Sequence, residues 1–124
     1  MSGVYEILAK IKAKPGMYIG RPSVSDLFMF LVGYECSRSE LGIENTEEEE
    51  DFYGEFQPWL QKKLGITTVS SWSKMIMLYC HDEKAGFEKF FSLLDEFKQR
   101  HQHLDGDGVN QMSEVVATAI KPSN

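Results

Sequence analysis

"GFEKFFSLLDEF", residues 86–97, is the stretch whose pattern decides the fold class. Its apolar residues recur at intervals of three and four: Phe87, Phe90, Phe91, Leu94 and Phe97. This spacing places them on one face of a helix, because an α-helix completes a turn every 3.6 residues. Asp82 stands just before the pattern and is a suitable N-cap. We therefore expect a long helix after Asp82 that buries its aromatic face.

The same period occurs at the beginning of the chain. Val4, Ile7, Leu8 and Ile11 follow the i, i+3, i+4, i+7 rule. Ser2 can cap this first helix, and the Pro15-Gly16 pair predicts its end.

A second helix is expected to begin at Pro22-Ser23, with Asp26 three residues after Ser23 as a weak capping box. It continues to Tyr34 and is apolar on nearly all sides, which is typical of a helix at the centre of a domain. Residues 37–45 are interpreted as a connector.

Two further helices follow from the apolar spacing. One runs from the acidic residues 47–51 to Leu64 and is closed by Gly65; Pro58 either kinks it or starts a new helix. The next, over residues 72–80, is capped by Ser70 or Ser71 and buries Trp72, Met75, Ile76, Tyr79 and Cys80.

The C-terminal part carries weaker signals. Residues 104–110, "LDGDGVN", are predicted to form a loop, and residues 113–120 a short helix or a frayed tail. No stretch alternates polar and apolar residues as a half-buried strand does. We therefore predict an all-α fold, a compact bundle of five or six helices that forms a single domain over residues 1–124.

The charge of the chain is concentrated in one region. The formal net charge is −6, yet residues 39–61 hold no Lys or Arg and contain eight of the 19 acids. The 11 remaining acids stand against 13 bases, so the rest of the chain is close to +2. An acidic strip of this kind argues against nucleic-acid binding and indicates a surface for a basic partner.

Residues 14–20, "KPGMYIG", resemble a segment in the ATP-binding domain of gyrase B-like ATPases. That resemblance implies a Glu and an Asn on the following helix, which here offers Asp26 and Glu35 but no Asn. We therefore interpret the segment as a turn whose glycines supply positive φ angles and which packs three residues under the second helix: Met17, Tyr18 and Ile19.

A second likeness covers about residues 15–97 and is spread over five short motifs. They are Arg21-Pro22-Ser23, Gly33-Tyr34, Phe56 with Trp59-Leu60, Ser71-Trp72 with Ile76, and the run from Phe87 to Phe97. This pattern is similar to that of small bacterial immunity proteins from toxin–immunity systems, such as contact-dependent growth inhibition. The resemblance implies an inhibitor that binds and neutralises a cognate toxin. A cytoplasmic location is expected separately, because residues 1–10 do not read as a secretory signal and the two cysteines, Cys36 and Cys80, have no metal-ligand or CxxC spacing.

The acidic strip has two interpretations: a solvated helix start or mobile loop, or a docking face for a basic toxin. A nuclease toxin holds phosphates with Lys and Arg, so a carboxylate array can occupy its active-site face. The candidate partner-binding residues are Glu44, Glu47, Glu48, Glu49, Glu50, Asp51, Tyr53 and Glu55. We expect that reversing residues 47–51 to Lys leaves folding intact and abolishes binding.

Other candidate chemistry does not form a site. His101 and His103 are two residues apart and face different sides of a helix, and the nearby Asp105 and Asp107 do not complete a calcium loop. Cys80, His81 and Asp82 are adjacent in sequence and do not present a nucleophile to its base.

We therefore predict no catalytic residue, metal or cofactor, and no membrane span. The alternative function is a small acidic adaptor that binds a basic host protein.

Overall fold

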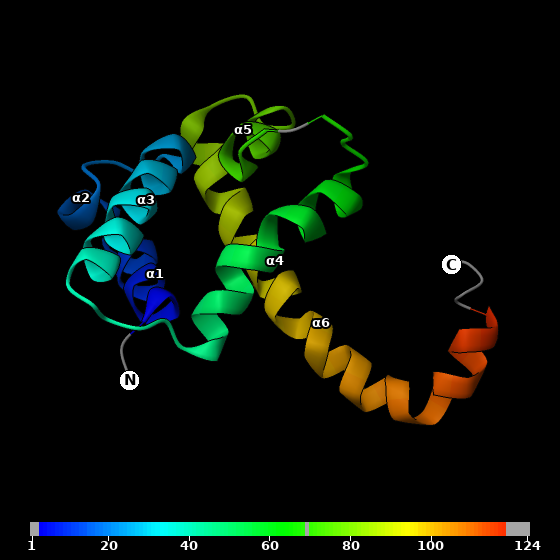
Figure 1. Ribbon diagram of the computed structural model, residues 1–124. Coiled ribbons are helices and arrows are strands. Elements are labelled where there is room, and N and C mark those ends of the chain that lie inside the picture. The colour runs from blue at the N-terminus through cyan, green and yellow to red at the C-terminus, as the bar shows by residue number, and fades with distance from the viewer. Residues whose placement is uncertain (1–2, 69, 119–124) are drawn as a thin grey trace. The chain divides into compact units, whose positions relative to one another are not determined.

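The computed structural model describes residues 3–68 and 70–118, with side chains described as far as Arg100 (Figure 1). Its helices, in chain order, are α1 (Val4–Ala13), α2 (Pro15–Tyr18), α3 (Val24–Glu40), α4 (Glu47–Leu64), α5 (Trp72–Met77) and α6 (Glu83–Thr118). The described ranges contain no strand, which confirms the all-α prediction.

The chain divides into two compact units, residues 1–92 and residues 93–124. The first unit holds α1 to α5 and the beginning of α6, and the second holds the rest of α6. The single domain over residues 1–124 stays a prediction. The loop predicted at residues 104–110 is wrong, because these residues belong to α6.

Helix α1 buries Val4, Leu8 and Ile11, as its spacing predicts. Its N-cap is Gly3, which supplies no side-chain cap; Ser2 lies outside the described residues. The backbone N–H of Val4 instead donates to Glu49 Oε2 at 2.9 Å, from 45 residues along the chain. A tertiary contact therefore replaces the local cap that the sequence predicted.

The turn after α1 agrees with its prediction only in part, because Gly16 lies within the short α2 and has no positive φ. Gly20 has a φ of 87°, in agreement with the expected role of a glycine there. Tyr18 and Ile19 are half-buried, but Met17 is 69% exposed, so its predicted burial is wrong. The short α2 directs this side chain away from the protein interior.

Helix α3 begins as predicted, with the Ser23 hydroxyl accepting from the Asp26 N–H at 3.1 Å. It continues to Glu40 and so includes part of the expected connector. The prediction of a central helix is wrong, because Met29 is 63% and Val32 45% exposed. One apolar side of α3 is therefore left at the surface.

Helix α4 starts with a complete capping box. The Thr46 hydroxyl accepts from the Glu49 N–H at 3.1 Å, and the Glu49 carboxylate accepts from the Thr46 N–H at 2.9 Å. The helix passes through Pro58 without ending, and Gly65 closes it with a φ of 69°. Such a left-handed C-cap favours glycine.

Helix α5 is capped by Ser71, one of the two predicted residues, and buries Trp72, Met75 and Ile76. Tyr79, expected on the same buried face, is 61% exposed, because α5 ends at Met77 and the spacing is lost beyond it. The Trp72 and Phe90 rings stack with their centroids 4.7 Å apart, at the centre of an aromatic core completed by Phe52 and Phe56.

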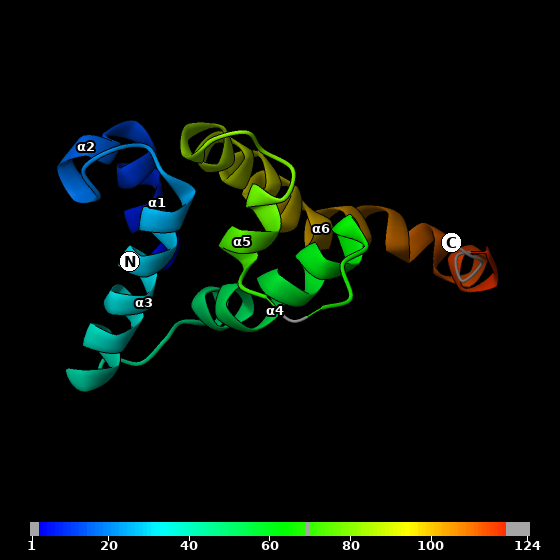
Figure 2. The same cartoon turned by 90° about the horizontal axis from the view of Figure 1, so that it is seen from above.

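Helix α5 packs against both α3 and α4, which lie further from each other. Figure 2 shows residues 41–46 as an extended bridge between α3 and α4, and Figures 1 and 2 both show α5 beside α4. This arrangement leaves a groove between α3 and α4, with α5 at one end.

The N-terminus of α6 is joined to that of α3. Asp82 caps α6 as predicted, by accepting from the Ala85 N–H at 2.8 Å. The Glu83 carboxylate accepts from the Ser25 N–H, the Ser25 hydroxyl and the Ser23 hydroxyl at 2.9, 2.8 and 3.1 Å. These bonds, led by the one from the Ser25 N–H, hold the pKa of Glu83 below its usual range.

Candidate partner-binding site

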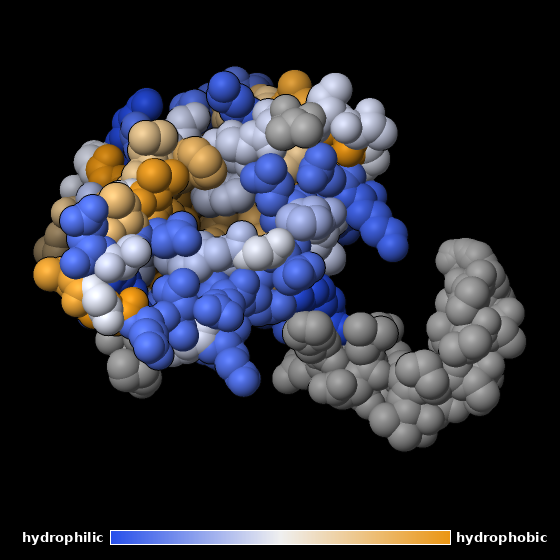
Figure 3. Space-filling model, in the orientation of Figure 1, coloured by the Kyte–Doolittle hydropathy of each residue, from blue (hydrophilic) through white to orange (hydrophobic). Residues whose placement is uncertain are grey.

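The side chains of α3 and α4 border an apolar groove, with α5 at one end. It has a volume of about 220 Å³ and is called here the α3–α4 groove. Eight residues line it: Phe28, Leu31, Val32, Glu35, Phe52, Tyr53, Gln57 and Trp72. Figure 3 shows hydrophobic side chains bordering a hollow on this face, with hydrophilic side chains along the adjoining edge.

Helix spacing explains which residues reach the groove. On α3, Phe28, Leu31, Val32 and Glu35 stand at i, i+3, i+4 and i+7, so they share one side. On α4, Tyr53 and Gln57 are one turn apart and face the same space. The groove is therefore apolar over most of its length and carries one carboxylate, that of Glu35.

The base and the end of the groove are rigidly built. Phe28 and Trp72 meet edge to face with their ring centroids 5.1 Å apart, and Phe52 and Phe56 stack at 5.3 Å. Phe52 and Trp72 also belong to the aromatic core, so the walls are supported from behind. A groove of this kind is largely preformed and loses little side-chain entropy when it is filled.

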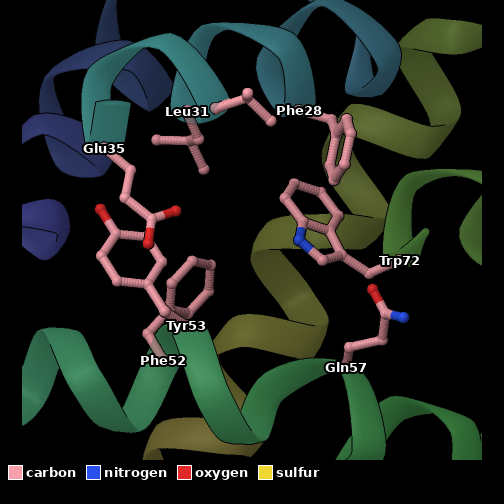
Figure 4. A pocket seen from close by; sticks show the side chains of 8 residues that line it. Phe28, Leu31, Glu35, Phe52, Tyr53, Gln57 and Trp72 are labelled. Carbon is pink, nitrogen blue, oxygen red and sulfur yellow. The ribbon is translucent and has the colours of Figure 1, made fainter. Parts of the chain in front are cut away.

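Tyr53 introduces an unsatisfied polar group into this apolar setting. Its hydroxyl oxygen is buried and has no hydrogen-bond partner among the described residues. Burial, followed by the proximity of Glu35 and Glu49, raises the pKa of Tyr53 above its ordinary value, so the hydroxyl stays protonated. Figure 4 shows Glu35 and Tyr53 at one end of the groove, with Phe28 and Trp72 at the other.

A second, more polar hollow adjoins the groove at Glu35. It has a volume of about 440 Å³ and is called here the acidic basin. Its lining consists of Glu35, Ser39, Gly42, Ile43, Glu44, Asn45 and Glu50. Neither lining includes Lys or Arg, so the two hollows together present three carboxylates and no compensating base.

The structure separates the eight candidate partner-binding residues into distinct environments. Glu44 and Glu50 line the acidic basin, and Tyr53 lines the groove. Glu47, Glu48 and Glu55 are exposed and Asp51 is half-buried, and none of these four lines either hollow. The acidic strip is thus distributed around α4 and does not form one face.

Glu49 is a correction to the predicted binding set. Its side chain is 1% exposed, and its carboxylate accepts from Val4 N–H, Thr46 N–H and Arg38 Nη2. This residue therefore joins α1, α3 and α4 from inside the protein and has no surface to offer a partner. Reversing residues 47–51 to Lys as a block would bury a Lys beside Arg38, so it cannot leave folding intact as expected.

Glu35 and the apolar lining were missed as partner-binding candidates. The available signal was a carboxylate at i+4 from Leu31 and i+7 from Phe28, on the same side of the helix as these apolar residues. Trp72 was assigned to the core; it is 8% exposed and lines the groove with its remaining surface.

Other proposed chemistry is placed as follows. The two acids considered in the comparison with gyrase B-like ATPases, Asp26 and Glu35, do not lie together. Asp26 is paired with Arg21 at 2.8 Å, and Glu35 lies nine residues further along α3, roughly 13 Å away by helix rise. The described residues hold no group of three or more His, Cys, Asp or Glu that could bind a metal. The side chains of His101, His103, Asp105 and Asp107 lie outside those the structure describes.

Within the described residues, no helix combines the length and apolar character needed to cross a membrane. The chain matches no protein-family model, no curated protein and no solved structure. No relative therefore assigns a role to the groove or the basin.

Proposed function

We propose that this chain is an immunity protein that binds and neutralises a bacterial toxin domain, a nuclease, in the cytoplasm. The observation that supports this proposal is the continuity of the α3–α4 groove with the acidic basin through Glu35. An apolar, aromatic-lined groove beside carboxylates fits a protein surface that is itself basic and partly apolar.

The carboxylates around the acidic basin and the apolar α3–α4 groove affect binding in different ways. The carboxylates of Glu35, Glu44 and Glu50 attract a basic partner and accelerate encounter, an effect that salt weakens. The groove supplies the desolvated contact that slows dissociation, because aromatic pockets concentrate binding energy at interfaces. Inhibition follows when the chain covers the basic face with which a nuclease holds phosphates.

The resemblance to immunity proteins supports the choice of a toxin as the partner. Its motifs fall largely on the framework of the site: Ser71-Trp72 starts α5 and Phe56 lies in the aromatic core. The groove residues of α3 lie between the Arg21-Pro22-Ser23 and Gly33-Tyr34 motifs, or just after them.

The test is a growth-protection assay with the product of the neighbouring gene, which the proposal requires to be a toxin domain. Cells that produce the toxin domain should survive when the wild-type chain is co-expressed, and the two proteins should co-purify. The double variant E35K/E50K changes two groove and basin residues and should lose both protection and co-purification.

The double variant E47K/E48K is the matched control. It makes the same change in charge at two exposed residues of α4 that line neither hollow, so it should retain most of the protection. Failure of the wild-type chain to bind or protect would contradict the toxin proposal. Binding without protection would instead favour an adaptor that recognises a basic protein.

A further inference from the structure

We propose that the α3–α4 groove is the anchor site for one long cationic side chain of the partner, best fitted by arginine. The aliphatic stem lies along Leu31 and Trp72, and the guanidinium reaches Glu35 and the Tyr53 hydroxyl. The inference rests on the proposed function only in assigning this arginine to a toxin domain. What it adds is the chemical group that the groove recognises.

The size of the groove admits such a side chain. Its volume of about 220 Å³ exceeds that of the engineered cavity of about 150 Å³ that binds benzene. The apolar walls match the methylene stem of Arg, because long cationic side chains bury their stems along apolar surface and keep the charged end in a polar setting.

The polar end of the groove matches a guanidinium. Glu35 contributes an exposed carboxylate, and Tyr53 contributes a buried, neutral hydroxyl oxygen without a partner. Guanidinium carries five N–H donors in a fixed plane, so it can pair with Glu35 and, once the buried Tyr53 hydroxyl turns toward the groove, donate to that oxygen as well. An apolar side chain alone would leave the Tyr53 hydroxyl unsatisfied and the Glu35 charge unbalanced.

The charges around the groove favour the same occupant. Of the surrounding groups, Glu44 and Glu50 in the adjoining basin add to the negative potential. Arg38, a base three residues after Glu35 on α3, is already bonded to Glu49 at 3.0 Å and to the Tyr34 hydroxyl at 3.4 Å, and its guanidinium lies 5.3 Å from the centre of the Tyr34 ring. Arg38 is thus engaged elsewhere, and a cation of the partner can pair with Glu35 without competing with a base of the groove lining.

The experiment uses the full chain and small probes, so it does not depend on a toxin. N-acetyl-arginine methylamide is titrated into the isotope-labelled protein while the Trp72 indole N–H and the Tyr53 ring are followed by NMR. N-acetyl-citrulline methylamide, which has the same shape without the charge, is the matched probe. We expect saturable shifts at Trp72 and Tyr53 with arginine, and binding roughly tenfold or more weaker with citrulline.

Three variants separate recognition from folding. E35Q should remove the preference for arginine over citrulline, while E40Q, the same change on the exposed end of α3, should preserve it. Y53F should weaken arginine binding several-fold yet leave the fold at least as resistant to urea, because it deletes a buried hydroxyl that has no partner.

Equal binding of the two probes, shifts confined to residues outside the groove, or no saturable shift in the wild-type chain would each overturn the inference. The outcome of this probe experiment does not depend on whether the partner is a toxin. A chain that binds the arginine probe but no toxin domain keeps the groove chemistry and loses the toxin.

Discussion

Glu49→Ala is expected to destabilise the protein more than any other single change in the acidic strip. The carboxylate accepts hydrogen bonds from three donors that belong to three different helix boundaries: Val4 N–H at the start of α1, Thr46 N–H before α4 and Arg38 Nη2 near the end of α3. Glu49 therefore closes one end of the first unit.

The magnitude follows from burial. The Glu49 side chain is 1% and the Arg38 side chain 15% exposed, so removal of the carboxylate leaves Arg38 with a poorly hydrated charge. Breaking a buried ion pair in this way costs about 3–5 kcal/mol. The two orphaned N–H groups, at about 1–3 kcal/mol each, are partly rehydrated once the site opens, so the costs do not add in full.

We expect E49A to lower the free energy of unfolding by about 3–5 kcal/mol, measured by urea denaturation followed by circular dichroism. E49Q keeps the shape but replaces one acceptor by a donor, and should cost about 1–3 kcal/mol. E48A, the exposed neighbour, is the control and should change stability by no more than about 0.5 kcal/mol. If E49A and E48A unfold at the same urea concentration with equal slopes, Glu49 does not join these helices and the reasoning is refuted.

Two further predictions concern the start of α6. Gly86→Ala adds a methyl group that would meet Val24 Cγ1 at 2.7 Å and Met77 Sδ at 2.9 Å. The overpacking cost of about 1–3 kcal/mol outweighs the gain in helix propensity of about 1 kcal/mol, so the midpoint of thermal unfolding should shift to lower temperature. A higher midpoint than that of the wild type would show that the contact is loose. Glu83→Ala should cost about 1–2 kcal/mol near neutral pH, because it removes three hydrogen bonds from a half-buried carboxylate. Since folding lowers the pKa of Glu83 from 4.5, the stability that its carboxylate contributes is present above that value and is lost as pH falls through the folded pKa. The difference in the free energy of unfolding between wild type and E83A, measured in urea, should therefore shrink in acid. A difference that does not change with pH would contradict this role of Glu83.

Local spacing was sufficient to predict much of the fold. The starts of α3, α5 and α6 agree with the capping residues Ser23, Ser71 and Asp82, because each cap is a contact between neighbours in sequence. The Thr46–Glu49 capping box carried the same kind of signal and was overlooked within the acidic run. The cap of α1 could not be predicted, because its acceptor is 45 residues away.

The candidate site was predictable only in part. Helix spacing alone does not say which apolar side of a helix is covered, so the exposure of Met29 and Val32 on α3 depends on where α4 and α5 pack. A run of acids likewise looks uniform in sequence, yet in α4 it turns through 100° per residue and places Glu49 inside and Glu50 at the basin. Three-dimensional packing, which composition does not reveal, decides which of these residues line the groove and the basin.

The most direct test of the proposed function is a structure of this chain bound to the product of the neighbouring gene, which the proposal requires to be a toxin domain. In this complex we expect Val32, Glu35 and Tyr53 to be covered, with a basic side chain in the α3–α4 groove within hydrogen-bond distance of Glu35. A complex in which the groove and the acidic basin remain open to solvent, with the toxin seated on another face, would contradict it.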